Sequence, residues 1–520
     1  MRPLDLLPFL ALILLLYLSL DLFRFLKRSW WDPLRLAKAM AAQGIRGPPY
    51  KFFHGSTSEA CKMIASSVAR SMDLSDHNIV PRVQPHFHSW IDRYGRNVLT
   101  WQGPTPRLVV GEPEMVKAVL WDRDGAYPKY EAPEFMKKLL GDGLVTTKGK
   151  KWVKKRRLAV HAFRSESIKG MIPAIVTGVE AMLTKWVELE GKEVDLFKEF
   201  SILASDIISR TAFDSSYSAE KDIFIKMDEL TAIAARNFHI VRLPFVRKFF
   251  PNQDDIESDR IEQEIRGSIM KLIQSREQRK EKGEIGGYGE DLLGLLMRAH
   301  HEGDEQSERI SIEDIIDECK TFYFAGQETT VSMLSWTSLL LAMNTEWQNR
   351  ARMEVMELLG DRTPSPNDSP AIAKLKTMTM ILNESLRLYP PVLNILRVVG
   401  RESRLGDLLL PRGMQIQISP LLIHHDPDTW GEDAHLFRPE RFASGIAGAT
   451  PAGGGAGFFP FGVGPRVCVG QGLAMVEAKV TFAMILQRYC FRLSPAYVHS
   501  PVSRLTCRPQ HGLQVVLQRL

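Results

Sequence analysis

The sequence predicts a mainly α-helical protein with a small β region, built as one large domain behind an N-terminal membrane anchor. Three observations carry this prediction: an uncharged apolar run at residues 6–20, long helical patterns from Ser56 onward, and few, short alternating strands. No internal repeat or second domain boundary interrupts the chain, although 520 residues would allow several domains of about 150. We therefore expect an anchor at 1–28, a hinge linker at 29–55 and a single domain at 56–520.

Composition and charge narrow the class of protein. Hydrophobic residues make up 44% and charged residues 25% of the chain, as in a folded globular protein with a sizeable core. The net charge of +6 is too small to indicate nucleic-acid binding, but it suits an anionic membrane surface or an acidic protein partner. The five cysteines are unclustered, odd in number and lack zinc-site spacing, which favours a reducing compartment.

The N-terminal apolar run is short for a membrane-spanning helix, which needs about 20 apolar residues. The helix can be completed if Arg24 and Lys27 extend their charged ends toward the interface. A cleaved secretory signal is the alternative, with a weak cleavage site at 37–39. Arg2 is the only basic residue before the run, whereas a cationic cluster follows it, so the positive-inside rule places the rest of the chain in the cytosol.

The predicted hinge at 29–55 leads from the membrane surface into the domain. Trp30 and Trp31 are expected to lie at the membrane interface. Residues 44–50 read Gly-Ile-Arg-Gly-Pro-Pro-Tyr, which predicts a stiff turn. The segment therefore predicts a connection that holds the domain near the lipid surface.

Besides the long helices, the sequence predicts short strands and two Gly-rich surface loops inside the domain. Apolar strands are expected at 98–101 and 107–110. Gly-rich runs at 283–290 and 445–457 indicate surface loops. The β region should accordingly be a minor part of the fold.

Cys468 lies in a Gly- and Pro-rich loop at 461–470, beside Arg466 and just before a helical run that follows Gly472. A thiolate is stabilised by a nearby positive charge, by backbone N–H groups and by a helix N-terminus. A single cysteine in an intracellular chain is more often an inert buried thiol. The spacing Phe-x-x-Gly-x-Arg-x-Cys-x-Gly, however, resembles the haem-binding loop of the cytochrome P-450 family.

That resemblance implies a cofactor and a metal ligand. The cofactor would be haem b, which is iron protoporphyrin IX, and the thiolate of Cys468 would be the proximal iron ligand. Arg466 would belong to the residues that bind the cofactor.

The basic segment 150–157 carries a second motif. Trp152 and Arg156 share a helix face, and a solvated basic helix with one buried Trp is the simpler explanation. The family uses Trp-x-x-x-Arg here to hold a haem propionate, so the resemblance implies that both residues bind the cofactor. Arg397 matches a second propionate-binding Arg, and the lysines of 150–157 would form a cationic patch on the proximal side.

The longest helical pattern covers residues 312–343 and opens with Ser311 and Asp314 as a variant capping box. At the α-helical rise it would be about 48 Å long, enough to cross the whole domain. Its middle, residues 325–330, places an acid and two hydroxyls inside an apolar helix, which is costly unless they are satisfied. By itself this segment is equally consistent with a helix kink and with a site.

The same segment resembles the family's Ala/Gly-Gly-x-Asp/Glu-Thr-Thr motif, which lies over the distal face of the haem. The resemblance implies that Glu328 and Thr329 are catalytic and manage the protons delivered to oxygen. Gly326 would let the oxygen ligand approach the backbone closely.

An amphipathic helix is predicted at 374–391, stopped by two prolines. Glu384 and Arg387 would pair on one face, and most such pairs are worth only a few tenths of a kcal/mol. The family pairs this Glu-x-x-Arg with a later Arg, here Arg441, so the resemblance implies a structural cluster that orders the loop before the cysteine. The His pair at 424–425 is expected to be solvent-exposed and not a metal site.

Five motifs in the family's order, from Trp152 to Gly470, extend the resemblance over essentially the whole chain. It implies a triangular, mainly α haem domain at 56–520 that acts as a haem-thiolate monooxygenase on a small apolar organic substrate and O2. No flavin or nicotinamide fingerprint stands in the right context, so NADPH–cytochrome P-450 reductase is the expected partner. The implied location is the endoplasmic reticulum membrane, single-pass, with the catalytic domain on the cytosolic face.

Two alternatives remain open at this point. A haem-thiolate isomerase or dehydratase acting on hydroperoxides is disfavoured by Glu328, Thr329 and the intact cysteine loop. A non-catalytic haem-binding sensor or carrier would be separated by NADPH oxidation coupled to product. For the substrate, the hinge and residues 430–434 resemble a plant group that oxidises terpenoids, including gibberellins, brassinosteroids and iridoids. The candidate pocket residues 394–396 predict only a largely apolar cavity.

Overall fold

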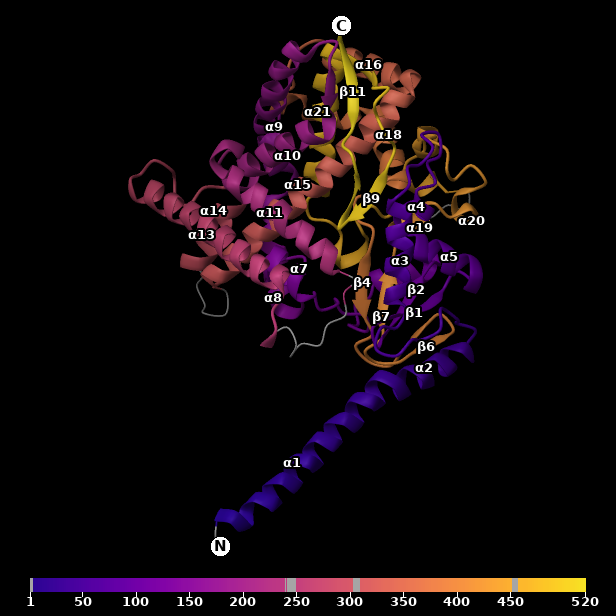
Figure 1. Cartoon of the computed structure of the whole chain (residues 1–520). Coiled ribbons are helices and arrows are strands. Elements are labelled where there is room, and N and C mark those ends of the chain that lie inside the picture. The colour runs from indigo at the N-terminus through magenta and orange to yellow at the C-terminus, as the bar shows by residue number, and fades with distance from the viewer. Residues whose placement is uncertain (1–2, 239, 241–248, 303–308, 451–456) are drawn as a thin grey trace.

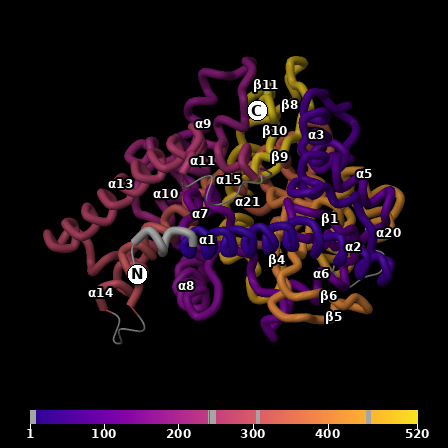
Figure 2. The backbone as a smooth tube through the Cα atoms, turned by 60° about the horizontal axis from the view of Figure 1, so that its bottom comes forward, coloured from indigo at the N-terminus to yellow at the C-terminus, as the bar shows by residue number. Residues whose placement is uncertain are grey.

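The computed structural model describes residues 3–238, 240, 249–302, 309–450 and 457–520. The predicted mainly α fold with a small β region is confirmed (Figure 1). In Figure 2, where the N-terminal helix comes forward, α13 and α14 lie at the left of the picture, and the strands β1, β5 and β6 lie at the right.

The helices have the following bounds: α1 Pro3–Leu26, α2 Asp32–Ala41, α3 Thr57–Val68, α4 Val80–Val83, α5 Pro85–Tyr94, α6 Pro113–Leu120, α7 Glu134–Leu140, α8 Gly149–Ala162, α9 Ser165–Trp186, α10 Leu196–Phe213, α11 Tyr217–Asn237, α13 Gln253–Glu281, α14 Leu292–His301, α15 Ile312–Met343, α16 Thr345–Leu359, α17 Ser369–Lys374, α18 Lys376–Leu388, α19 Pro420–His424, α20 Pro427–Trp430 and α21 Gln471–Arg488. The strands are β1 Val98–Gln102, β2 Thr105–Val110, β3 Glu193–Asp195, β4 Ile395–Val398, β5 Ser403–Leu405, β6 Leu408–Leu410, β7 Gln415–Ile418, β8 Tyr489–Leu493, β9 Pro501–Arg504, β10 Thr506–Pro509 and β11 Gln514–Arg519.

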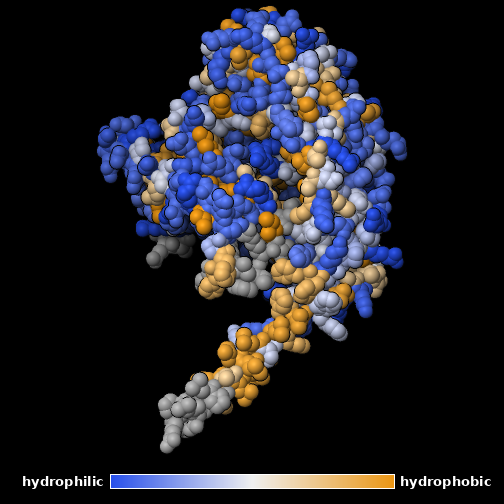
Figure 3. All heavy atoms as spheres, viewed as in Figure 1, coloured by the Kyte–Doolittle hydropathy of each residue, from blue (hydrophilic) through white to orange (hydrophobic). Residues whose placement is uncertain are grey.

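The helix α1 extends away from the rest of the protein, and apolar side chains cover it on the face seen in Figure 3. Within the described part of the chain, one stretch, Phe9–Ala41, is long and apolar enough to cross a membrane. Trp30 and Trp31 are exposed shortly after the end of α1 at Leu26, where interfacial aromatic residues are expected. Part of the predicted hinge, Asp32–Ala41, is helix α2, and the division into anchor, hinge and domain stays a prediction.

Helix α15 begins where the sequence predicts. The Ser311 hydroxyl accepts a hydrogen bond from the Asp314 N–H at 3.1 Å, and the Asp314 carboxylate accepts one from the Ser311 N–H, which completes the capping box. Helix α10 packs directly on α15 at Gly326, where an added Cβ would lie 2.7 Å from the Ile208 side chain. Gly326 therefore serves helix packing, and its expected role in the approach of an oxygen ligand stays a prediction.

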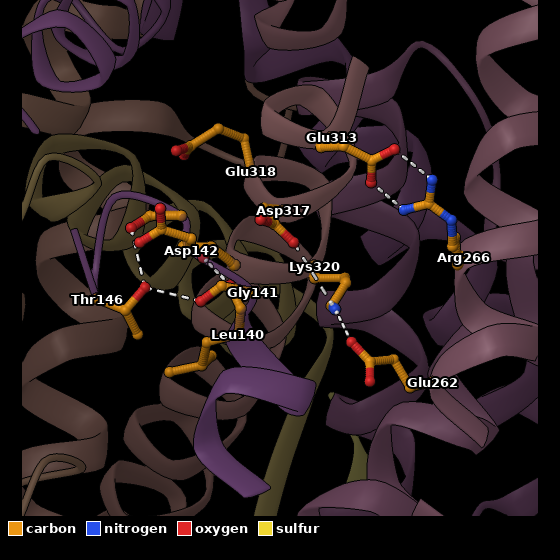
Figure 4. Close-up of polar contacts among 12 residues, drawn as sticks. Leu140, Gly141, Asp142, Thr146, Glu262, Arg266, Glu313, Asp317, Glu318 and Lys320 are labelled. Atoms are coloured by element: carbon orange, nitrogen blue, oxygen red, sulfur yellow. Dashed lines mark hydrogen bonds and ion pairs between the residues drawn. The ribbon is translucent and has the colours of Figure 1, made fainter. Parts of the chain in front are cut away.

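The N-terminal half of α15 is anchored by charged contacts to its neighbours (Figure 4). Lys320 of α15 binds Glu262 of α13 at 2.9 Å, and Arg266 of α13 forms an ion pair with Glu313. The end of α7 lies so close that a Cβ on Gly141 would overlap the Asp317 side chain. These contacts hold α7, α13 and α15 in fixed register.

Acidic residues in the first turns of α15 also form ion pairs with lysines of α8. Lys155 is buried, with its Nζ 3.1 Å from both Asp314 and Glu318, and Lys151 lies 2.7 Å from Asp314. The expected cationic patch at 150–157 is therefore wrong for these two lysines, because tertiary contacts neutralise them.

The cluster around Glu384 is formed as the sequence predicts. Arg387 donates two hydrogen bonds of 2.8 Å to the two carboxylate oxygens of Glu384, and both side chains are fully buried. The Nε of Arg441 lies 3.6 Å from the same carboxylate. Arg387 also donates to the backbone carbonyl oxygens of His424 and Ala434, so the cluster orders the segment that leads toward the cysteine loop.

The expectation that His424 and His425 are exposed is wrong. Both are buried, and the N–H of Phe459 donates to His424 Nε2 at 3.1 Å. Burial, with Arg387 nearby, lowers the pKa of His424 to about 3, so its ring stays neutral. His425 is held by the Leu388 carbonyl oxygen at 2.8 Å. The pair supports the fold.

The main sheet has the strand order β1-β2-β7-β4, and β2 and β7 run parallel. Its two faces differ in chemistry. The face that contains Leu108, Val110, Ile416 and Ile418 packs into an apolar cluster. The side chains that alternate with them, on the opposite face, are polar at several positions: Thr100, Gln102, Arg107, Gln415 and Gln417.

Candidate active site

The cysteine loop is a tight turn that delivers Cys468 to the N-terminus of α21. Gly462 and Gly464 both have positive φ, and a Cβ on Gly464 would lie 2.3 Å from the Leu120 carbonyl oxygen, so only glycine fits there. The N–H of Cys468 donates to the Phe461 carbonyl oxygen at 2.8 Å. Because α21 begins at Gln471, the predicted place of Cys468 before a helix is confirmed.

Cys468 is exposed, and it lines a cavity of ≈ 380 Å³. Burial in the domain raises the pKa of the thiol, whereas the backbone N–H groups of Gly470 and Gln471 and the charge of Arg156 oppose that effect. A metal ion at the sulfur would provide further stabilisation of the thiolate.

The cavity next to Cys468 is a largely apolar slot between the cysteine loop and α15. Ala325, Gly326, Thr329 and Thr330 of α15 line it together with the loop. Its other apolar walls include Leu120, Leu144, Phe163, Phe322, Met333 and Leu473.

Four cationic side chains gather at this cavity: Lys129, Arg156, Arg397 and Arg466. In the part of the chain that the structure describes, none of them forms an ion pair with an acidic side chain. The guanidinium of Arg466 lies 4.4 Å from the ring centre of Trp152, which also lines the cavity. The site therefore holds an excess of positive charge.

The pKa values reflect this crowding of cations. Burial lowers the pKa of Arg397 and of Arg466 to about 10. Burial, together with the charges of Arg397 and Arg466, lowers the pKa of Lys129 to about 7. A bound dianion would reverse these shifts and stabilise the whole cluster.

These residues fit haem b. The slot is apolar, the thiol on its wall is a suitable iron ligand, and the unpaired cations suit two propionates. The structure brings together Trp152, Arg156, Arg397, Arg466 and Cys468 from three separate parts of the chain. Lys129 escaped the sequence analysis, because only its pairing with Arg397 across an isolated β-bridge places it there.

The structure places the two candidate catalytic residues differently. Thr329 lines the cavity, and its hydroxyl donates to the Ala325 carbonyl oxygen at 2.7 Å. Glu328 is buried and is not among the residues that line this cavity. Its carboxylate accepts a 2.8 Å hydrogen bond from Thr506 and lies 3.6 Å from Arg508, on strand β10. Burial raises the pKa of Glu328, while Arg508 opposes that shift.

A larger cavity of ≈ 410 Å³ adjoins the first one. The two share Lys129, Val145, Ala325, Thr329, Val392 and Asn394. Of the predicted pocket residues, Asn394 lines both cavities, Leu396 the larger one and Ile395 the smaller one. Thr329 therefore stands where the two spaces meet.

The chain is similar to known proteins in sequence and in fold. A family model described as Cytochrome P-450 matches residues 81–514. The chain is 50% identical to cytochrome P-450 CYP749A22 of Panax ginseng, over 98% of this chain and 97% of that protein. It is 36% identical to the 7-deoxyloganic acid hydroxylase of Catharanthus roseus, over 99% of this chain and 100% of that protein.

A solved structure, the retinoic acid-bound cyanobacterial CYP120A1, matches with a TM-score of 0.72 over 83% of this chain and 93% of that one. Since the two sequences are 24% identical, this likeness shows the fold alone.

Proposed function

This chain belongs to the cytochrome P-450 family of haem monooxygenases, and we propose that it hydroxylates a terpenoid or related plant metabolite with electrons from a separate NADPH-dependent reductase. The observation that carries the proposal is the thiol of Cys468 facing a slot that four unpaired cations surround. The haem, when bound, supplies the oxidation itself, in which one oxygen atom of O2 enters a substrate C–H bond and the other leaves as water.

The chain's own residues bind and orient this group. Cys468 would provide the thiolate ligand, and Arg156, Arg397, Arg466 and Lys129 would bind the propionates. Trp152 would keep the Arg466 guanidinium in place through its 4.4 Å contact. The apolar walls would keep bulk water from the reacting oxygen.

Thr329 would control the proton at the reaction centre. Its Oγ1 donates to the Ala325 carbonyl oxygen in this structure, and a rotation about χ1 would turn the donor toward the cavity. Glu328 lies away from the cavity, so its proposed part is to hold a proton near Thr506 rather than to touch the substrate. The raised pKa of Glu328 supports this part, since it favours the protonated carboxyl group.

Substrate, partner and location complete the proposal. The relative that is named a 7-deoxyloganic acid hydroxylase supports a terpenoid-derived substrate. The stretch Phe9–Ala41 supports a membrane anchor, and the cationic residues that follow the apolar run support a cytosolic domain at the endoplasmic reticulum.

The proposal is tested by Thr329→Ala in a mixture with reductase and NADPH, measuring NADPH loss, hydrogen peroxide and product together. A positioned proton donor contributes ~10²–10⁴-fold, and because water can replace part of it we expect product per NADPH to fall by at least ~10-fold. NADPH should still be consumed, with more of it ending as peroxide.

The matched control is Thr337→Ala. Thr337 lies on the same helix but donates to Ser385 at 2.9 Å, outside both cavities. Unchanged product per NADPH in Thr329→Ala would show that α15 only shapes the cavity. Product formation without NADPH would instead indicate an isomerase.

A further inference from the structure

The polar face of the main sheet lies inside the domain, against the larger cavity. Strand β7 reads Gln-Ile-Gln-Ile, and all four of its residues are buried. Its two isoleucines pack into the apolar cluster, whereas Gln417 lines the cavity with Thr100, Gln102 and Arg107 of the neighbouring strands. A buried sheet face normally carries apolar residues. The polar side chains on this face are therefore costly unless they find hydrogen-bond or charge partners.

Arg107 is the charged centre of this polar face. Its Nε and Nη2 donate to Gln415 Oε1 at 2.9 and 2.7 Å, and its Nη1 donates to Gln417 Oε1 at 3.0 Å. Nη2 also donates to Gln102 Oε1. These four bonds leave one of the five N–H groups of the guanidinium, on Nη1, without an acceptor in the described part of the chain.

The acceptors around Arg107 are all neutral amides. Arg107 forms no ion pair with any acidic side chain of the described residues, although 93% of its surface is buried. Burial lowers the pKa of Arg107 to about 10, which still leaves the group charged at neutral pH. A buried cation without a counter-ion is costly, so the protein carries an unfilled requirement for an anion here.

The other buried arginine of this cavity, Arg82, has a structural explanation. It donates to the backbone carbonyl oxygens of Val68 at 3.2 Å and Pro501 at 3.3 Å, and to Gln510 at 2.9 Å. Arg82 thereby closes the C-terminus of α3, where free carbonyl oxygens favour a cation. Among the residues that the structure describes, no helix end or carboxylate explains Arg107 in the same way.

The remaining walls of the cavity are suited to a hydrocarbon. They include Ile64, Val68, Phe87, Trp90, Met136 and Phe324, while Thr329 marks the side that adjoins the cysteine cavity. One cavity thus combines an apolar space, a reacting side at α15 and a single cation on the sheet.

We propose that the substrate is a hydrocarbon carrying one carboxylate, which binds Arg107 on the polar face of the sheet while its apolar part lies against α15. This inference rests on the proposed function and names its substrate class. A carboxylate would accept from the free Nη1 N–H, neutralise the charge and keep the acid away from the oxidised carbon. A neutral carbonyl or hydroxyl could accept the hydrogen bond but would leave the charge unpaired. A phosphate or diphosphate would carry more negative charge than the single guanidinium of Arg107 can neutralise.

The test measures binding affinity by equilibrium dialysis of the haem-loaded full-length enzyme. The ligands are two terpenoid acids of different size, 7-deoxyloganic acid and retinoic acid, and each acid is compared with its methyl ester. We expect at least one acid to bind at least about 10-fold more tightly than its ester, because a hydrogen bond to a charged group is lost in the ester. In Arg107→Gln, affinity for that acid should fall by about 10- to 100-fold, with ester affinity within about threefold. Arg107→Lys should restore part of the preference.

Arg404→Gln, an exposed arginine of β5, is the matched control and should change neither affinity. The haem content of each variant shows whether it has folded. The proposal is overturned if no acid binds more tightly than its ester in the wild type, a comparison that needs no variant. It is also overturned if a folded Arg107→Gln keeps the acid preference. Acid preference without any NADPH-dependent product would instead contradict the proposed function and leave the Arg107 site standing.

Discussion

Glu477 of α21 is a buried carboxyl group at the wall of the cysteine cavity. Its Oε1 has no hydrogen-bond partner among the described residues, and burial raises the pKa of this carboxyl group to about 8. In an unfolded chain the same group titrates at about 4.3. Between these values the unfolded state loses its proton while the folded state keeps it, so stability is full below about pH 4.3 and falls as the pH rises toward 8.

Glu477→Gln removes this titration. Relative to wild type, the variant should gain unfolding free energy as the pH rises from 5 to 8, by on the order of 1–3 kcal/mol in total. Urea unfolding followed by circular dichroism at several pH values measures the difference. Glu357→Gln, an exposed position on α16, serves as the control and should follow the wild-type pH profile. If the unfolding free energies of Glu477→Gln and of the wild type change with pH in parallel, this carboxyl group ionises in the folded protein.

At the residue scale, local motifs located Cys468, Trp152, Arg156 and Arg466 correctly at one cavity. They could not reveal Arg107, because its significance lies in the absence of an acid among its spatial neighbours. Spacing in the sequence records which residue types are present but not which charges remain unpaired after folding.

The cluster of α18 with the segment after it is the clearest case of an element held by buried charge. Glu384 accepts two hydrogen bonds from Arg387, and Arg441 approaches it while binding Asp433 at 2.6 Å. Removing the negative charge would leave the fully buried Arg387 guanidinium without a counter-ion, which typically costs about 3–5 kcal/mol.

Glu384→Gln should therefore lower the unfolding free energy by about that amount and reduce haem content after purification. Haem content from the absorbance of the pyridine complex, with chemical denaturation, measures both effects. The neighbouring Arg438→Gln breaks an exposed pair with Asp433 and should cost less than about 1 kcal/mol. Equal losses in the two variants would argue against a special role for the buried cluster.

At the element scale, the start of α15 was predictable because a capping box is local. The ion pairs of the α8 lysines could not be predicted, since Asp314 and Glu318 lie more than a hundred residues away in the sequence. The exposure of His424 in α19 and of the adjacent His425 was also predicted wrongly, because tertiary packing covers this Pro- and Asp-rich segment.

For the whole molecule, the predicted topology can be checked at a natural glycosylation sequon. The chain has sequons at Asn367 and Asn383, and only Asn367 is exposed. If the domain is cytosolic, the full-length protein made in a eukaryotic cell should show no mobility change after endoglycosidase treatment. A sequon added ahead of the anchor should be glycosylated and provides the positive control. A glycan on Asn367 would show that the domain lies on the lumenal side and would contradict the predicted orientation.

The sheet shows the limit of sequence reasoning at this scale. Strands β1 and β2 were predictable as neighbours, but β2 pairs in parallel with β7, which places Arg107 beside Gln415. Only that long-range pairing creates the polar face inside the domain. The fold class followed from composition and helix patterns, whereas the shape and charge of the substrate cavity followed from topology.

The central claim is that Cys468 provides the thiolate ligand of a haem monooxygenase. The most direct measurement is the absorption spectrum of the reduced, carbon monoxide-treated protein, compared between wild type, Cys468→Ser and Cys490→Ser. Cys490 is a half-buried cysteine of β8 that lines neither cavity, so its variant controls for the loss of a thiol. We predict the thiolate-type band in wild type and Cys490→Ser and its loss in Cys468→Ser, because a neutral hydroxyl cannot replace the anionic sulfur. A thiolate-type band that persists in Cys468→Ser would contradict the account.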